Sequence, residues 1–243
     1  MSYITLLDWD TEFFGFPVAQ IVTDRLDQNN LDEALRFCRE HQVKLLQFKC
    51  DAHHRPSVLL AEANSFHMAD IRITFGKRLK AADREPFLPD DISFRIGEEK
   101  DISVLKEIVT DLYTHSRYYV DSNFPREDVH IFYGNWIEKS VRGDFDDCVW
   151  LLAKADLPVG CCSISYESEV AASIGLFAVD EEFSGQGLGA LLLGKVFQQL
   201  ISQGVKTLSV ATQGRNYLAQ RLYQRVGFQT EKFEIYYHCW FDV

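Results

Sequence analysis

Apolar residues in the first eighty positions recur first at helical and then at strand spacing. In "LDEALRFCREH" (31–41) they fall on one face of a helix. The stretch "KLLQFKC" (44–50) is strand-like, "VLLAEAN" (58–64) predicts a short helix, and "DIRITF" (70–75) is strand-like again. This part of the chain is therefore expected to form a helix followed by a strand–helix–strand unit.

A charged stretch, "KAADREPFLPD" (80–90), interrupts this pattern and holds two of the six prolines. Charge and proline together are typical of a linker. We therefore expect a smaller N-terminal domain at 1–80, a linker at 81–90 and a larger domain at 91–243.

Strands and helices alternate again after the linker, and the pattern predicts a mixed α/β fold with an antiparallel portion. The stretch from 113 to 145 is aromatic and is expected to be irregular, whereas "ADLP" (155–158) predicts a hairpin turn. The expected strands are 92–96, 149–155, 159–167, 172–179, 207–212 and 232–240, and the expected helices are 101–113, capped by Asp101, 189–203 and 218–226.

Residues 44–75 align with residues 206–237 at a constant offset and without a gap, although only five positions are identical. Both segments share the order strand, turn, helix, aromatic residue and strand. Two interpretations stay open. Either the N-terminal half is a shortened relative of the C-terminal half, or any two strand–helix–strand units would look this similar.

Composition and charge exclude several classes of protein. A formal net charge of -11 argues against a general nucleic-acid binder, which needs a basic face. The N-terminus carries acids where a signal peptide needs bases, and no apolar run reaches the ~18 residues of a membrane span. Six scattered cysteines form no C-x-x-C pair, so we expect free thiols in a cytoplasmic protein without a bound metal.

The stretch "FSGQGLGA" (183–190) places three glycines at alternate positions before an apolar helix. A dinucleotide-binding turn needs its first glycine at the end of the strand, but "DEEFS" intervenes, and the next strand ends without a ribose-binding acid. A P-loop fits "GALLLGKV" (189–196) only in part, because Val196 stands where a magnesium-binding Ser or Thr is needed.

A third interpretation uses the whole neighbourhood of the turn. A strand "LFAV" (176–179), an acidic turn, "SGQGLG" (184–189), an apolar helix, a strand, "GRN" (214–216) and a helix ending in "LYQRVGF" (222–228) follow in order. This order closely resembles the acetyl-CoA-binding core of the Gcn5-related N-acetyltransferase (GNAT) superfamily. The superfamily turn reads [RQ]-x-x-G-x-[GA], and Ser184 departs from it, so we expect only the Ser184 backbone amide to serve the cofactor.

The chemistry of the turn agrees with this resemblance, because successive amides at the start of a helix can hold a pyrophosphate. Gly187 and Gly189 would let the backbone approach it. The resemblance also implies a GNAT fold with flanking helices, a reduced GNAT-like N-terminal half, and Tyr223 as the acid that protonates the departing CoA thiolate. It implies that acetyl-CoA is bound by Phe177, Ala178, Val179, Ser184, Gly185, Gln186, Gly187, Leu188, Gly189, Ala190 and Asn216.

Three further stretches, "WDTEFFGFPVAQI" (9–21), "SRYY" (116–119) and "YGNWIEKSVRGDF" (133–145), are similar to GNAT enzymes that acetylate thymidine-diphosphate amino sugars. The resemblance implies a nucleotide amino sugar as the acceptor. Aromatic rings suit the base and Arg forks suit the diphosphate. The expected acceptor contacts are Arg117, Tyr118, Tyr119 and Arg142.

The expected reaction is direct attack of a primary amine on acetyl-CoA, since no cysteine shows a sign of nucleophilic activation. The base stays open between ordered water and four side chains, namely His115, Asp121, His130 and Glu167. Other acceptors also stay open: a peptide N-terminus, a polyamine or an antibiotic amine. A CoA-sensing module without catalysis is the non-enzymatic alternative, and the sequence allows a homodimer.

Overall fold

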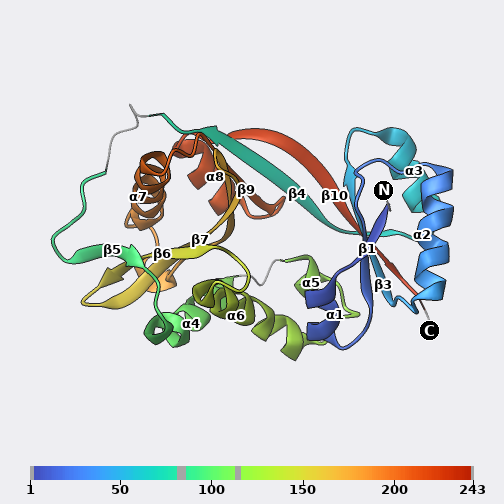
Figure 1. Cartoon of the computed structure of the whole chain (residues 1–243), viewed down its shortest axis with the longest axis horizontal. Helices are drawn as coiled ribbons and strands as arrows, with labels where there is room; N and C mark the ends of the chain where they lie inside the picture. Colours follow the sequence, from blue (N-terminus) through green and yellow to red (C-terminus); the bar gives the residue numbers. More distant parts are fainter. Residues whose placement is uncertain (1–2, 81–85, 113–115, 242–243) are drawn as a thin grey trace.

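The computed structural model describes residues 3–80, 86–112 and 116–241, which form a single ten-stranded sheet with helices on both faces (Figure 1). The strand order is β1-β2-β3-β10-β4-β9-β8-β7-β6-β5. Only β2–β3 and β8–β9 are parallel neighbours, so the expected mixed, mostly antiparallel fold is confirmed.

The strands are β1 (Ile4–Leu6), β2 (Val18–Ile21), β3 (Leu45–Asp51), β4 (His67–Arg78), β5 (Ile92–Ile96), β6 (Cys148–Lys154), β7 (Leu157–Ser168), β8 (Ala171–Val179), β9 (Thr207–Gln213) and β10 (Gln229–Trp240). The helices are α1 (Asp8–Phe14), α2 (Gln28–Glu40), α3 (Arg55–Ala63), α4 (Ile102–Leu112), α5 (Arg117–Val120), α6 (Arg126–Arg142), α7 (Leu188–Ser202) and α8 (Tyr217–Arg225), with 3-10 turns η1 (Glu99–Asp101) and η2 (Glu181–Phe183).

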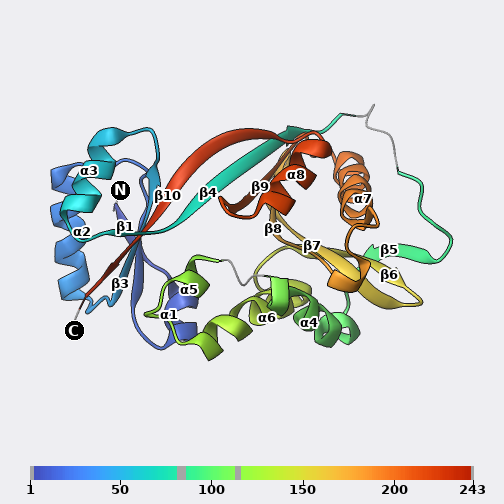
Figure 2. The ribbon, with the colours of Figure 1, turned by 180° about the vertical axis from the view of Figure 1, so that it is seen from behind.

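Three hydrophobic clusters hold the helices on the sheet. One packs α7 and α8 against the C-terminal strands, and a second packs α4 and α6 on the opposite side of β6–β8 together with α1. The third packs α2 and α3 against β2, β3 and β10. Figures 1 and 2 show α7 and α8 on one side of these strands and α4 and α6 on the other.

The structure corrects the prediction that residues 113–145 are irregular. Most of the stretch is helical, and α6 alone has 17 residues. Its buried residues, among them Val129, Phe132, Tyr133 and Ile137, recur at helical spacing and pack on α4 and α1. Three consecutive large apolar residues, the exposed Ile131 followed by the buried Phe132 and Tyr133, obscured the helical period in the sequence.

Asp101 also differs from its expected role as the cap of α4. It lies in η1, where its carboxylate accepts a hydrogen bond from the Glu98 amide and a bidentate pair from Arg95. The buried carboxylate therefore joins β5 to the turn before α4.

The order of elements predicted from the internal alignment is confirmed. At the offset that places Lys44 on Lys206, the bounds of β3, α3 and β4 coincide with those of β9, α8 and β10. The two units also exchange their last strands, since β10 pairs with β3 and β4 pairs with β9. Figure 1 shows β4 and β10 running side by side between the two ends of the molecule.

The strand β8 leaves its parallel neighbour β9 halfway along. The two strands pair only from Ala171–Thr207 to Ile174–Val210. A register shift against β7 follows at once, so that Gly175 and Leu176 both lie opposite Ser163 in a β-bulge. A bulge bends a strand and ends its pairing, and the last five residues of β8 therefore lie beyond the ladder with β9.

Candidate active site

The end of β8 presents its backbone to the opening between β8 and β9. The Leu176 amide donates to the Ser163 hydroxyl on β7 (2.7 Å), and the Asp180 amide donates to Val159 on the same strand (3.0 Å). Backbone groups alternate along a strand, so those of Phe177 and Val179 face the side that β9 has left. An extended ligand could add to this strand edge.

The glycine turn follows directly and ends at the first turn of α7. Gly185 and Gly187 have positive φ values, 75° and 84°, and a Cβ at either position would meet no atom within 4 Å. Gly187 is the N-cap of α7 without a side-chain cap, and its carbonyl accepts the first helical bond, from Leu191. The amides of residues 188–190 therefore have no acceptor inside the helix, and such amides at a helix start can bind an anion.

The structure changes the explanation expected for three residues of the turn. The Ser184 amide donates to the Glu181 carbonyl (3.0 Å), so it is not left for a cofactor as expected. Gly189 has ordinary helical φ; its missing side chain instead leaves room for Leu222, since a Cβ would lie 3.1 Å from Leu222 Cδ2. The Gln186 side chain donates to the Glu182 carbonyl.

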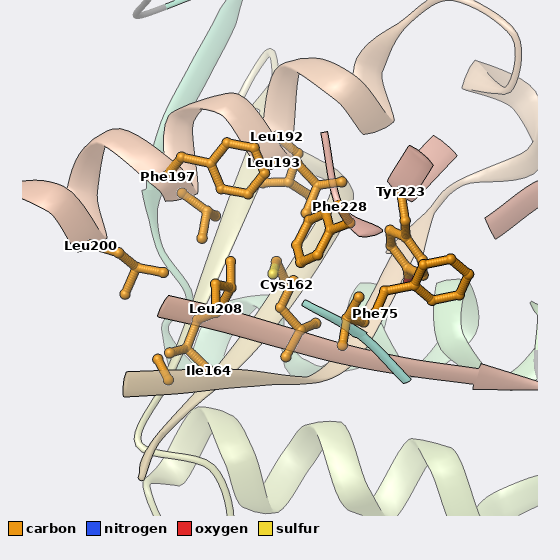
Figure 3. Packing of buried hydrophobic residues seen from close by; sticks show 14 of the residues in the cluster. Phe75, Cys162, Ile164, Leu192, Leu193, Phe197, Leu200, Leu208, Tyr223 and Phe228 are labelled. Atoms are coloured by element: carbon orange, nitrogen blue, oxygen red, sulfur yellow. The ribbon is translucent and has the colours of Figure 1, made fainter. Parts of the chain in front are cut away.

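Tyr223 lies where α8 meets the end of β8. Its side chain is 4% exposed, and its ring packs against Phe75, Phe228 and Phe177 (Figure 3). Among the described residues, none forms a hydrogen bond with its hydroxyl. Burial raises the pKa of Tyr223 well above its ordinary value, so the hydroxyl keeps its proton and can act as a donor.

Asn216 begins the helix that carries Tyr223. Its side-chain oxygen accepts a hydrogen bond from the Ala219 amide (3.1 Å), which makes it the N-cap of α8. This hydrogen bond accounts for an asparagine at position 216 without any ligand. The expected contact of Asn216 with the cofactor stays a prediction.

The buried thiols offer no nucleophile. All six cysteines are free, and burial raises the pKa of Cys161, which is paired with Ala178 of β8 across the strands, to about 12. Burial likewise raises the pKa of Cys162, so both thiols stay protonated at neutral pH.

On the other face of the sheet, Arg117 lies at the start of α5 between two tyrosine rings. Its Cζ is 4.1 Å from the centroid of Tyr118 and 4.4 Å from that of Tyr236 on β10. One guanidinium nitrogen donates to the Tyr118 hydroxyl, which in turn donates to Asp10 of α1. Among the described residues no carboxylate lies within ion-pair distance of the Arg117 guanidinium group. Two tyrosine rings and the Tyr118 hydroxyl hold this group in place.

The three neighbouring acceptor candidates differ in their surroundings. Tyr118 is 2% exposed and serves the bridge between Arg117 and Asp10. Tyr119 is half-buried, with Arg126 above its ring at 5.2 Å. Of the three, Tyr118 is the one turned wholly into the core.

Arg142 is not brought together with Arg117. It ends α6 and pairs with Glu138 and Glu99 (2.7 and 3.3 Å). Tyr133, whose pKa is affected by Arg117, lies nine residues earlier on the same helix, about half a turn away around its axis. Arg142 instead lines a hollow of about 380 Å³ between α1 and α6, bordered by Trp9, Glu12, Phe13, Asn135, Glu138 and Lys139.

None of the described base candidates stands at the opening between β8 and β9. Asp121 accepts from His238 (2.7 Å) and Trp240 (2.8 Å); it is partly desolvated, but these hydrogen bonds lower its pKa to about 2. His130 is exposed on α6, and Glu167 is exposed near the β7–β8 turn, at the opposite end of β8. His115 lies outside the described residues.

Sequence reasoning missed Asp146, which fixes α6 to the bulge in β8. Its buried carboxylate accepts hydrogen bonds from Trp136 (2.9 Å), Ser140 (2.7 Å) and Ser165 (2.7 Å). A Cβ on Gly175 would lie 2.6 Å from this carboxylate, so the bulge needs glycine there. The signal in the sequence was an acid directly before a buried strand, which is too common to be informative.

The opening between β8 and β9, the glycine turn at α7 and the tyrosine on α8 together define an acetyltransferase-type site. Residues 106–228, about half of the chain, match the acetyltransferase (GNAT) family, and the chain belongs to that family. The crystal structure of a GCN5-related N-acetyltransferase from Sphaerobacter thermophilus is 16% identical in sequence, with a TM-score of 0.67 over 97% of this chain and 75% of that one. At this identity the likeness concerns the fold alone.

Two relatives have more specific descriptions. The spore coat polysaccharide biosynthesis protein SpsD of Bacillus subtilis is 29% identical over 149 residues, which are 60% of this chain and 51% of that protein. The dTDP-fucosamine acetyltransferase of Escherichia coli is 32% identical over 137 residues, 56% of this chain and 58% of that protein. The match thus spans only a little over half of either relative.

Among the described residues, every helix is too short or too polar to span a bilayer. In the same residues, no three or more His, Cys, Asp or Glu side chains come together in a way that could hold a metal ion.

Proposed function

We propose that the protein transfers an acetyl group from acetyl-CoA to the primary amine of a nucleotide-linked amino sugar, with a thymidine-diphosphate amino sugar as the first acceptor to test. The observation that carries the proposal is the parting of β8 and β9 beside an uncapped helix α7 and the buried Tyr223. The family uses acetyl-CoA, and one relative's name specifies dTDP-fucosamine as its substrate.

The cofactor would lie along the opening. The pyrophosphate would accept hydrogen bonds from the amides of residues 188–190, and the pantetheine would pair with the backbone of Phe177 and Val179. Positive φ at Gly185 and Gly187 keeps this turn free of side chains at the phosphates.

The reaction would be a direct attack in a ternary complex, because the buried thiols are protonated and cannot form an acetyl-enzyme. The amine nitrogen forms a bond to the thioester carbon, the carbon–sulfur bond breaks, and sulfur takes the proton of the Tyr223 hydroxyl. The nitrogen loses one proton as it becomes an amide, and solvent passes a proton back to the Tyr223 phenolate, so the enzyme returns to its starting state. A phenol is a weaker acid than a free thiol, so the proton moves as charge develops on sulfur.

The acceptor would approach from the other face of the sheet, where Arg117 offers guanidinium N–H groups to the diphosphate. We propose that the Tyr119 ring contacts the acceptor next to Arg117, and that Tyr118 holds the Arg117 guanidinium group in position. We leave Arg142 out of this site, because its guanidinium is paired with two glutamates.

We further propose that residues 1–80 are a reduced acetyltransferase-like unit, joined by residues 81–90 to the catalytic unit at 91–243. In this half the Asp27 side chain caps α2 by accepting from the Asn30 amide (2.9 Å), so the helix start that corresponds to α7 is occupied. The Ser57 hydroxyl of α3 accepts from the Leu26 amide and donates to the Leu26 carbonyl in the loop before α2, and β2 stays paired with β3 along its whole length, from Val18–Leu45 to Ile21–Phe48.

Mass spectrometry on the wild-type enzyme with acetyl-CoA and a set of nucleotide amino sugars tests the proposal. One product that is heavier by one acetyl group supports it. Acetylation only of a peptide N-terminus, a polyamine or an antibiotic amine would contradict the acceptor class. Binding of acetyl-CoA without turnover of any amine would indicate a CoA-sensing module and not an enzyme.

A further inference from the structure

Asp70 is a buried carboxylate on β4 that the mechanism above does not use. It is 5% exposed, and its Oδ1 accepts a hydrogen bond from the Ile71 amide (2.8 Å). Burial raises the pKa of Asp70 even though the Ile71 amide, Arg215 and Arg117 lower it. A carboxylate in such surroundings holds a proton more readily than an exposed one.

The strand register places Asp70 beside the opening between β8 and β9. Arg72 of β4 is the partner of Gln213, the last residue of β9, so Asp70 lies level with Arg215 just beyond that strand. Arg215 Nε is 4.0 Å from Asp70 Oδ1 and directly precedes Asn216, the cap of the helix that carries Tyr223.

Asp70 and Tyr223 lie on opposite faces of the sheet. Ile73, three residues after Asp70, packs in the same cluster as Tyr223, whereas Asp70 is paired with Tyr236, whose ring stacks on Arg117. In acyl transfer the base acts on the attacking nitrogen and the acid acts on the departing sulfur, which are different atoms of the tetrahedral intermediate. An acid on one face and a base on the other can therefore act without competing for the same position.

The surroundings of Asp70 match both ends of the proposed acceptor. The charged and titratable groups that face it are Arg215 from the loop after β9, Arg117 from α5, Tyr133 from α6 and Tyr236 from β10. The Asp70 carboxylate would accept a hydrogen bond from the ammonium group, and the two guanidinium groups, which repel an ammonium group, would face the diphosphate.

We propose that Asp70, contributed by the N-terminal half, binds the acceptor ammonium group and takes its proton before attack. This inference rests on the proposed function. The ammonium loses one H⁺ to the Asp70 carboxylate, and the neutral amine attacks the thioester carbon. The nitrogen loses its second proton to solvent as the amide forms, and this balances the proton that Tyr223 gives to sulfur and regains. The Asp70 carboxylic acid returns its proton to water after the product leaves. Asp70 is then a catalytic residue, and β4 brings it into the site through the exchange of strands.

The test is Asp70→Asn, which keeps the shape and removes the base, assayed with any amine that the wild type acetylates. We expect kcat/KM for the amine to fall roughly 100-fold or more at pH 7. The deficit should shrink to less than about tenfold above the pKa of the ammonium, roughly 8 to 10, where solution supplies the free amine. The KM for acetyl-CoA should change less than about twofold, in keeping with a role confined to the acceptor side.

Glu234→Gln is the matched control. Glu234 is another buried carboxylate, on the neighbouring strand β10, and it pairs with Arg72 of β4 (2.7 Å) and with Lys232 (2.9 Å). The substitution should lower the melting temperature without changing the shape of the pH profile. An Asp70→Asn enzyme whose deficit is the same at every pH, or that affects only KM for the amine, overturns the role as base. A wild type that acetylates no amine overturns the proposed function itself.

Discussion

The ring of Tyr223 meets the ring of Phe177 edge to face, with 6.2 Å between their centroids. Phe177 belongs to the part of β8 that has left β9, and Tyr223 is buried on α8. The contact therefore places a protonated phenol next to the strand edge that we propose binds the pantetheine.

Tyr223→Phe should lower kcat on the order of 100-fold or more, because it removes the proton donor for the thiolate and keeps the ring. Acetyl-CoA affinity should stay within about twofold, since the ring contacts with Phe75, Phe177 and Phe228 are retained. Steady-state kinetics with calorimetry measures both quantities. Turnover as fast as that of the wild type would remove Tyr223 from the mechanism.

The pH dependence of the wild type gives a control for this role. Burial raises the pKa of Tyr223, so its acidic form persists to higher pH than that of an exposed tyrosine. We expect kcat not to decline near pH 10, where an ordinary tyrosine would lose its proton. A decline centred there would indicate an unperturbed phenol.

Gly187→Val should raise the acetyl-CoA dissociation constant at least tenfold, because the side chain would stand at the uncapped start of α7. Gly204→Val is the matched control: Gly204 also has positive φ (89°) and open space around its Cβ position, but it follows the other end of α7. Both variants should lose stability by roughly 1–2 kcal/mol or more. Only the first should lose affinity in calorimetry; equal affinities would remove the turn from the cofactor site.

Arg117→Ala should weaken the nucleotide sugar roughly 10- to 150-fold, the loss expected for a charge-assisted hydrogen-bonded pair. Acetyl-CoA affinity should change little, because Arg117 lies on the other face of the sheet from α7. Arg126→Ala, at an exposed arginine nearby, serves as the comparison. Equal losses for both substrates would mark Arg117 as a structural residue.

One acetyl-CoA should bind per chain, although the fold contains two related halves. In the N-terminal half the Asp27 cap occupies the helix start that α7 leaves open, and β2 pairs with β3 along its whole length, whereas β8 leaves β9 halfway. Calorimetry should give a stoichiometry near one, and Gly187→Val should weaken that single event. A second binding event of similar affinity would contradict the reduced role of residues 1–80.

The parts of the fold that local patterns determine could be predicted from the sequence. The strands and helices from 149 onward, the glycine turn and the repeat of β3, α3 and β4 all follow from spacing and turn chemistry. The long helix α6 could not be predicted, because the consecutive apolar residues 131–133, one of them exposed, obscured the helical period. The exchange of β4 and β10 depends on strand pairing between distant segments, which a single sequence does not reveal.

The proposed site likewise has one part that the sequence predicted and one part that it did not. Its proposed cofactor side lies in one stretch of chain, where the family resemblance pointed to the turn and to Tyr223. Its proposed acceptor side draws Asp10, Asp70, Arg117 and Tyr236 from four separate elements. Asp10 and Arg117 both stood in stretches quoted for the resemblance, but only Arg117 was singled out, and the contacts of Asp70 and Asp10 appear once the fold brings these elements together.

A crystal structure of the wild type with a non-transferring acetyl-CoA analogue and a nucleotide amino sugar tests the central claim most directly. The account predicts the pyrophosphate on the amides of residues 188–190, the pantetheine along Phe177 and Val179, and the sulfur within hydrogen-bonding distance of the Tyr223 hydroxyl. The sugar amine should point at the thioester from the side of Asp70 and Arg117. A cofactor bound elsewhere, or an amine on the same face as Tyr223, would contradict the account.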